Sequence, residues 1–307
     1  MTKHESKAHR KAMETELNQA IQDGRLRIGL PMWFMQEWRG NLLSHWQDSG
    51  AALMEYSQVF GSVEGNTTFY GLPDTVRVNA WLKAVPDSFR FCFKLPRDIT
   101  HERNLVDGLQ RHWQAWRAFS DQLGQALGQV FIQLPASFGP DRLDELHGLL
   151  QRLLEAESAS LCVELRHPAF FDKGIHEQTL LRVLADHAVS RVIFDSRGLF
   201  SDRSQTAEVL EAQRKKPRMP VHPVATGSSP VVRFIGHSQW RENEVYLEQW
   251  RNKLLQWLGE GRTPYVFLHT AGNQDVQHFV RFVERLWQID TLPWPGEEST
   301  GRSGELF

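Results

Sequence analysis

Short apolar runs alternate with segments of helical periodicity along most of the chain. Each apolar run is short enough to form one buried strand, and in the segments between them apolar residues recur as they do on one face of a helix. The predicted strands are 26–30, a short strand at Val63, and then 89–95, 129–134, 161–165, 191–194, 231–235 and 265–268. The predicted helices are 52–60, 74–84, 113–127, 141–155, 177–187, 244–258 and 276–287.

This alternation continues without a change of composition that would mark a domain boundary. It predicts an α/β fold, a single TIM-type (β/α)8 barrel over residues 26–290, because helical crossovers join parallel strands. The main alternative is an open, doubly wound sheet. No Gly-x-Gly-x-x-Gly sequence opens any of the predicted helices, which disfavours a dinucleotide-binding sheet.

Three segments fall outside the repeat. Residues 1–25 are a charged extension, either an amphipathic helix that caps the barrel or a mobile segment. Residues 197–229 are too long for an ordinary connection and are predicted to be an insertion after strand six. The insertion contains the basic run 213–218, which is a solvated loop or, because loops after barrel strands surround the active face, a functional patch. Residues 291–307 form a C-terminal tail.

Polar side chains gather where the predicted strands end. Alternate residues of a barrel strand point inward, and the last inward positions at the carboxyl ends form the active site of such barrels. Nearly every strand ends with a polar residue, whereas the opposite phase is bulky and apolar. The predicted cluster comprises Glu64, Lys94, Gln133, Glu164, Arg166, Asp195, Arg233 and His269.

The charges of this cluster suggest roles for its members. Candidate catalytic residues are the three carboxylates and the histidine, namely Glu64, Glu164, Asp195 and His269. Candidate substrate-binding residues are the cations and amides of the cluster, joined by loop residues after strands two and three: Lys94, Gln133, Arg166, Arg233, Asn66, Tyr70 and His101. The alternative is an internal ion-pair network that only holds the mouth of the barrel together.

Composition limits the choice of partners and cofactors. Lys and Arg total 35 against 37 Asp and Glu, and this balance argues against a dedicated nucleic-acid binder. The carboxylates and His269 are possible ligands of a divalent metal, but no motif such as His-Glu-x-x-His is present, so a metal is the less favoured interpretation. The oligomeric state is left open.

Apolar segments and cysteines of the sequence bear on where in the cell the protein is located. No apolar stretch approaches the ~20 residues that cross a bilayer, so no membrane partner is expected. The N-terminal residues carry no run like that of a signal peptide. Cys92 and Cys162 lie inside apolar strands and are predicted to be buried free thiols in a reducing compartment. A cytoplasmic location is therefore expected.

Several separated motifs occur in order along the chain: 61–70 (GSVEGNTTFY), 89–94 (FRFCFK), 100–101, 133–135, 163–168 (VELRHP), 195–197 and 233–236 (RFIG). Together they resemble one known family, the YecE-like family (domain of unknown function 72). The resemblance covers roughly 26–290 and implies a TIM-type barrel, but no established reaction. Many members read Arg-x-His-Gly where this chain has Ile235, and Phe-Asn-Asn where it has 268–270. These departures indicate the YecE branch of the family.

Three functions remain in competition. The first is an enzyme that acts on a small anionic or sugar-like substrate by carboxylate acid–base chemistry, with isomerase, lyase and hydrolase not distinguished. The second is a metal-dependent nuclease or nucleic-acid-binding protein, suggested by the basic run and the cationic strand ends. The third is a non-catalytic binding protein in which the cluster is structural.

Overall fold

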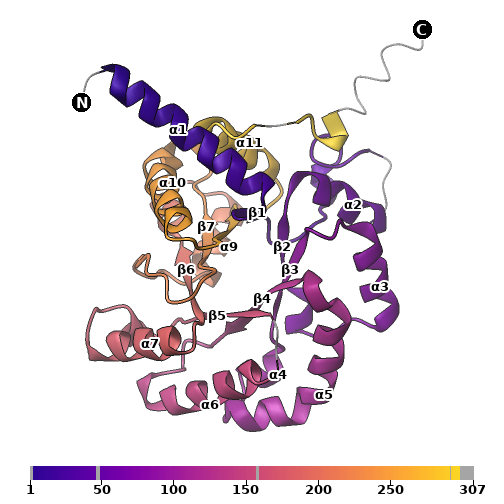
Figure 1. The fold of residues 1–307 in the computed structure, drawn as a ribbon, viewed down its shortest axis with the longest axis vertical. Helices are drawn as coiled ribbons and strands as arrows, with labels where there is room; N and C mark the ends of the chain where they lie inside the picture. The colour runs from indigo at the N-terminus through magenta and orange to yellow at the C-terminus, as the bar shows by residue number, and fades with distance from the viewer. Residues whose placement is uncertain (1–2, 46–48, 157–158, 291, 298–307) are drawn as a thin grey trace.

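Eight parallel strands form the centre of the molecule and follow one another around a barrel (Figure 1). The computed structural model describes residues 3–45, 49–156, 159–290 and 292–297, with the side chains of 3–12 and 49 left out. The strands are β1 (Arg27–Gly29), β2 (Ser62–Gly65), β3 (Arg90–Lys94), β4 (Leu127–Gln133), β5 (Ser160–Glu164), β6 (Ser190–Asp195), β7 (Val231–Ile235) and β8 (Tyr265–His269). This architecture confirms the predicted (β/α)8 barrel.

Helices surround the strands on the outside (Figure 1). In chain order they are α1 (Lys3–Gln22), α2 (Ser49–Val59), α3 (Thr75–Ala84), α4 (Arg97–Thr100), α5 (Leu105–Leu123), α6 (Leu143–Leu154), α7 (Ile175–Asp186), α8 (Arg197–Ser201), α9 (Ala207–Lys215), α10 (Glu244–Gly259) and α11 (Val276–Trp287). Six short 3₁₀ helices lie in the connections among the described residues. Among the described helices, none has the length and apolar character that a membrane span requires.

The prediction of a helix over 113–127 was wrong at both ends. Helix α5 begins earlier, because the Asn104 side chain accepts hydrogen bonds from the first-turn amides of Val106 and Asp107. It ends at Leu123, and the residue that follows, Gly124, has a positive φ of 50°. Leu127 already belongs to β4, so the predicted helix ran into the next strand.

The barrel closes between β1 and β2 through a few specific hydrogen bonds. The Glu64 amide donates to the Leu30 carbonyl at 2.9 Å. The Tyr56 hydroxyl, from α2, accepts from the Leu30 amide at 2.8 Å and donates to the Ser62 carbonyl at 2.9 Å. The described chain shows no continuous ladder between these two strands, so a buried tyrosine joins them.

Close approach of the two strands requires a glycine at position 29. A β-carbon there would overlap the Ser62 backbone carbonyl, which cannot move aside as a flexible side chain could. We expect Gly29→Ala to lower the free energy of unfolding by about 1–3 kcal/mol, the usual cost of overpacking a core. Gly71→Ala is the matched control, because no atom lies within 4 Å of the added carbon. Equal urea midpoints for the two variants would contradict this closure.

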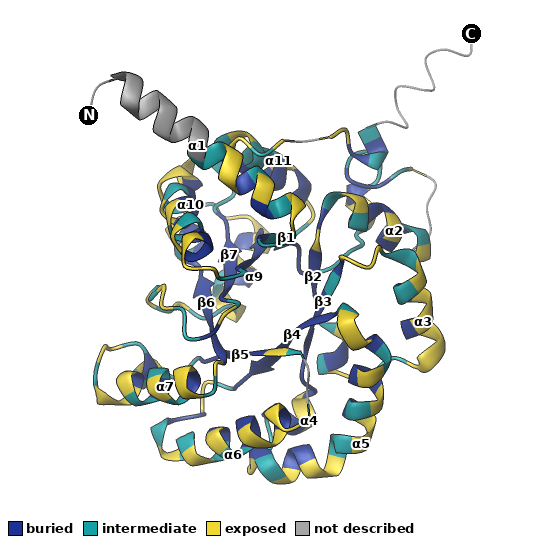
Figure 2. Cartoon of the chain, viewed as in Figure 1, coloured by how far each residue is buried: buried dark blue, intermediate teal, exposed yellow. Residues whose placement is uncertain are grey.

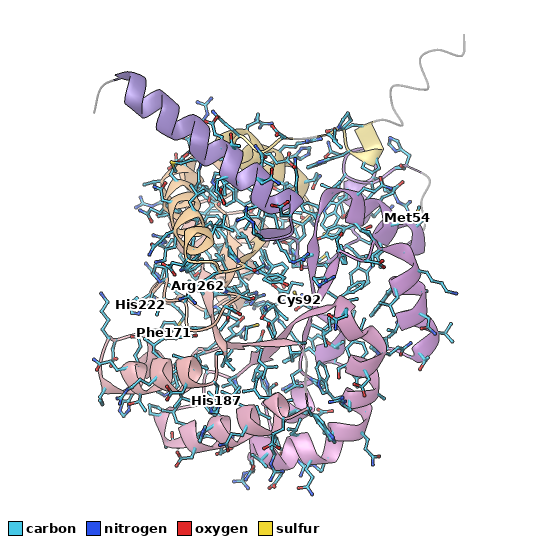
Figure 3. The ribbon with its side chains drawn as sticks, viewed as in Figure 1. Met54, Cys92, Phe171, His187, His222 and Arg262 are labelled. Atoms are coloured by element: carbon cyan, nitrogen blue, oxygen red, sulfur yellow. The ribbon has the colours of Figure 1, made fainter. Side chains whose placement is uncertain are left out.

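Two apolar layers bury the strands, which appear dark blue in Figure 2. Outward-facing Phe91 and Phe93 stack on Trp81 of α3 and form part of the layer between strands and helices. The interior is filled by Cys92, Phe131, Cys162, Val192, Val231, Tyr265 and Phe267. Both cysteines lie there as buried free thiols, and Cys92 is seen near the barrel centre in Figure 3. Burial raises the pKa of the Cys92 thiol to about 12.

Two of the segments outside the repeat contain helices. Helix α1 packs beside α10, with Leu17 and Ala20 buried, and Asn18 donates to the Gln288 carbonyl after α11. The insertion after β6 contains the helices α8 and α9, which the sequence pattern did not predict. The predicted C-terminal tail lies outside the described residues except for 292–297.

Candidate active site

Six of the predicted residues share the inward phase and come together at the carboxyl ends of the strands. They are Glu64 of β2, Lys94 of β3, Gln133 of β4, Glu164 of β5, Arg233 of β7 and His269 of β8, and all are buried. Each lies two residues beyond a member of the barrel interior, or in register with one, as the period of a strand requires. The site is therefore a direct continuation of the barrel core.

Arg233 is the centre of the cluster. Its Nε and Nη2 donate to the two Glu64 carboxylate oxygens at 2.7 and 2.8 Å. Its Nη1 donates to Glu164 Oε2 from the opposite side. The guanidinium also lies 5.1 Å from the ring centroid of Phe194 on β6. One fixed cation thus binds two buried carboxylates from distant strands.

Glu164 also binds a second cation, nearer to solvent. Arg166 Nε and Nη2 donate to Glu164 Oε1 at 2.9 and 2.7 Å. The Arg166 side chain is 27 % exposed, whereas that of Glu164 is 1 % exposed. Arg166 therefore extends the charged cluster from the buried strand ends toward the surface.

Lys94 has an uncharged partner. Its Nζ donates to Gln133 Oε1 at 2.7 Å and lies 5.5 Å from the ring centroid of Phe69. No ion pair joins Lys94 to a carboxylate within the described part of the chain. Burial lowers the pKa of Lys94 to about 8, and nearby Arg233 acts in the same direction. Lys94 is thus a buried amine near the midpoint of its titration at neutral to mildly alkaline pH.

The two carboxylates remain ionised. Burial alone would raise their pKa values, but Arg233 and the other cations outweigh it and lower both. The pKa of Glu164 falls to about 2, and that of Glu64 lies well below its ordinary value. A carboxylate with so low a pKa is a weak base, so these two residues are better suited to holding Arg233 than to moving protons.

His269 is neutral in this environment. Burial lowers its pKa to about 4, although Glu64 opposes the shift. Its Nε2 lies 3.3 Å from Glu64 Oε2, but without the geometry of a hydrogen bond, and no other described group satisfies that atom. A buried polar atom without a partner usually faces a water molecule or a ligand.

The comparisons with known proteins follow the same boundaries as the barrel. The family model for the protein of unknown function DUF72 matches residues 27–299. The chain belongs to the DUF72 family. It is also 40 % identical to the UPF0759 protein YecE of Escherichia coli K12 over 271 residues, which cover 87 % of this chain and 93 % of that protein.

Solved structures of the family have the same fold. A DUF72 protein from Enterococcus faecalis matches with a TM-score of 0.64 and 18 % identity, over 88 % of this chain and 98 % of that one. A DUF72 protein from Thermotoga maritima matches with a TM-score of 0.59 and 18 % identity, over 84 % and 99 %. At this identity the likeness concerns the fold alone. The family description supplies no reaction for this DUF72 protein.

Sequence reasoning did not include Lys216 among the site residues of this DUF72 chain. The residue directly follows α9 in the insertion, within the basic run 213–218. It is half-buried, and burial lowers its pKa to about 8, with Arg233, Glu64, Glu164 and Lys94 as its interacting charges. The two lysines of the run therefore differ: Lys215 is exposed and pairs with Glu211. Lys216 follows the end of α9, where Ala212 packs in one buried cluster with Phe194 and Ile235 of the barrel.

Asp195 was wrongly placed in the cluster. Phe194 is its inward neighbour, so Asp195 points outward between β6 and the helices. Its carboxylate accepts from Arg197 Nε and Nη2 and, at 2.7 Å, from the indole of Trp250 on α10. The strand-end rule failed here because the polar residue of β6 has the outward phase. The structure assigns Asp195 to packing between layers.

The structure places the three predicted loop residues differently relative to the cluster. His101 is half-buried beside Phe69, and burial together with Arg97 lowers its pKa. The Phe69 ring also lies 5.5 Å from Lys94 Nζ, so His101 lies at the edge of the mouth. Asn66 donates to the Pro31 carbonyl at 3.1 Å and joins two loops. Tyr70 is 82 % exposed and is not brought into the cluster.

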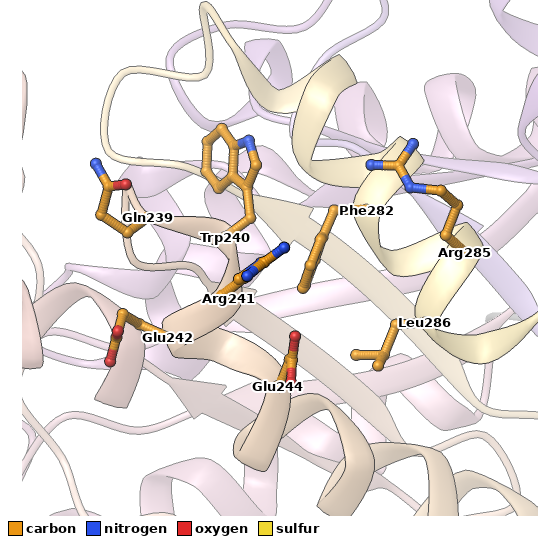
Figure 4. Close-up of a pocket in the computed structure, with 8 residues that line it drawn as sticks. All are labelled: Gln239, Trp240, Arg241, Glu242, Glu244, Phe282, Arg285 and Leu286. Atoms are coloured by element: carbon orange, nitrogen blue, oxygen red, sulfur yellow. The ribbon is translucent and has the colours of Figure 1, made fainter.

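Two other features of the described chain do not extend the site. No group of three or more His, Cys, Asp and Glu side chains comes together there as a metal site would require. A hollow of about 720 Å³ lies outside the barrel between 239–244 and α11 (Figure 4). Its lining includes Trp240, Phe282 and Arg285, and none of the predicted site residues.

Proposed function

We propose that this protein is an enzyme that acts on a small anionic substrate at the carboxyl ends of its barrel strands. The observation that carries the proposal is an excess of cations over carboxylates at one place. Arg233 and Arg166 are paired with Glu64 and Glu164, whereas Lys94 is held only by a neutral amide. A buried ammonium is costly unless it is paired, so an anionic ligand would stabilise it.

The arrangement also supports proton transfer by Lys94. An amine with a pKa of about 8 can give and accept protons near neutral pH, which is the range a general acid or base requires. The carboxylates Glu64 and Glu164 hold Arg233 in place, and the neutral His269 presents a polar ring nitrogen. We therefore propose Lys94, and not the carboxylates, as the group that carries the proton. Arg166 and Arg233 bind the substrate through their positive charges.

We expect Lys94→Met to reduce turnover of a substrate by at least about 100-fold, because general acid–base groups contribute that much or more. The substrate would first be sought with a panel of small carboxylates, sugar acids and phosphate esters, by the rise in melting temperature that binding produces. Arg166→Ala is expected mainly to raise KM, because it removes a cation at the rim.

Lys83→Met is the matched control, because Lys83 is an exposed lysine in the last turn of α3. Binding to the wild-type protein should also weaken as the pH rises through about 8, where Lys94 loses its charge. A ligand response that survives both Lys94→Met and Arg166→Ala would show that the proposed site is in the wrong place. Binding that is lost in these variants without any turnover by the wild type would identify a non-catalytic binding protein.

A further inference from the structure

Lys216 reaches the mouth from a different part of the chain than the strand-end residues. Helix α9 ends one residue before it, and the Lys216 amide caps that helix by donating to the Ala212 carbonyl at 2.8 Å. The next residue is fixed as well, because Ser196 Oγ donates to the Pro217 carbonyl at 3.0 Å. Ser196 directly follows β6, so the insertion is tied to the rim where Lys216 enters.

The charges that act on one another at the mouth do not balance. Lys94, Arg166, Lys216 and Arg233 are cations, Glu64 and Glu164 are anions, and His269 is neutral. Four positive charges against two negative charges leave a formal charge of +2. In the described residues, neither lysine has an ion pair with a carboxylate. The excess charge therefore resides on the two lysines.

We infer that the mouth binds a compact dianion of the phosphate-monoester class, and that Lys216 of the insertion binds it together with Lys94. This inference rests on the proposed function and specifies its substrate class. A single dianionic group matches the excess charge. Ala212, one turn before Lys216, lies in one buried cluster with Phe194, whose ring centroid is 5.1 Å from the Arg233 guanidinium, so the chain leaves α9 at Lys216 beside the mouth. Lysine binds phosphate as a point charge, and Arg166 adds planar donors at the rim.

The experiment compares inorganic phosphate with acetate and succinate at pH 7.5 and constant ionic strength, by isothermal titration calorimetry on the full chain. The variants are Lys216→Ala and Lys215→Ala, which remove the same charge from adjacent positions. Lys215 is the control, because it is exposed and pairs with Glu211 on the surface of α9. Circular dichroism and urea unfolding would establish that both variants are folded.

We expect phosphate to bind the wild type and Lys215→Ala equally, and Lys216→Ala about 10- to 100-fold more weakly, as for the loss of one contact to a charged group. Equal phosphate affinity in the two variants would overturn the role of Lys216. Acetate or succinate binding as tightly as phosphate would overturn the phosphate class, yet leave the proposed anionic substrate intact. Binding of none of the three anions would overturn the inference, while the substrate panel and Lys94→Met still test the proposed function separately.

Discussion

Arg233→Met is expected to lower the free energy of unfolding by about 3–5 kcal/mol at neutral pH, the usual result of removing one partner from a buried ion pair. Methionine fills much of the same space, but Glu64 and Glu164 would then face each other without the cation between them. Both carboxylates are almost fully buried, so solvent cannot compensate. Urea unfolding at pH 7 measures the loss, and Arg203→Met, at an exposed position of the insertion, is the control.

The pH dependence gives this prediction a second test. In the wild type the folded pKa of Glu164 is about 2, below an unfolded value of about 4.3, so its stabilising contribution is complete above the unfolded value. That contribution is lost as the pH falls through the folded value. In Arg233→Met, burial would instead raise the carboxylate pKa values, and protonation in acid would relieve the repulsion.

The difference between wild type and variant should therefore shrink from pH 7 to pH 4. A difference that stays constant over this range would mean that Arg233 stabilises the barrel mainly by packing. A stability equal to that of the wild type at pH 7 would contradict the central role of the Glu64–Arg233–Glu164 network.

The barrel could be predicted from the sequence because strands and helices leave different periodic patterns in the chain. The inward phase of β3 and β5 was readable, since charged Lys94 and Glu164 alternate with bulky apolar neighbours. On β6 the two phases are less distinct, because Phe194 faces the barrel interior and Asp195 the helix layer. A polar residue at a strand end therefore did not suffice to assign its direction.

The position of Lys216 could not be predicted from local sequence. It follows another lysine in a basic run, and nothing in that run distinguishes the exposed Lys215 from the half-buried Lys216. The two lysines differ in exposure because α9 ends between them and because Ser196 donates a hydrogen bond to the Pro217 carbonyl. Both are features of the folded insertion. The proposal that Lys94, and not a carboxylate, carries the proton likewise depends on the contacts of Arg233 with Glu64 and Glu164, which only the structure provides.

Asp195→Ala is expected to cost about 3 kcal/mol of stability, yet leave anion binding unchanged. The buried Trp250 indole would lose its hydrogen-bond acceptor, and Arg197 would lose the carboxylate with which it pairs. The Arg197 side chain is 32 % exposed and can turn to water. We therefore expect a loss of stability at the lower end of the range that is usual when one partner of a buried ion pair is removed. The measurement combines urea unfolding with phosphate titration. Glu64→Gln is the comparison, because it disturbs Arg233 directly and should change anion affinity. Loss of phosphate binding in Asp195→Ala, in protein shown to be folded, would place Asp195 back in the functional site and contradict its outward role.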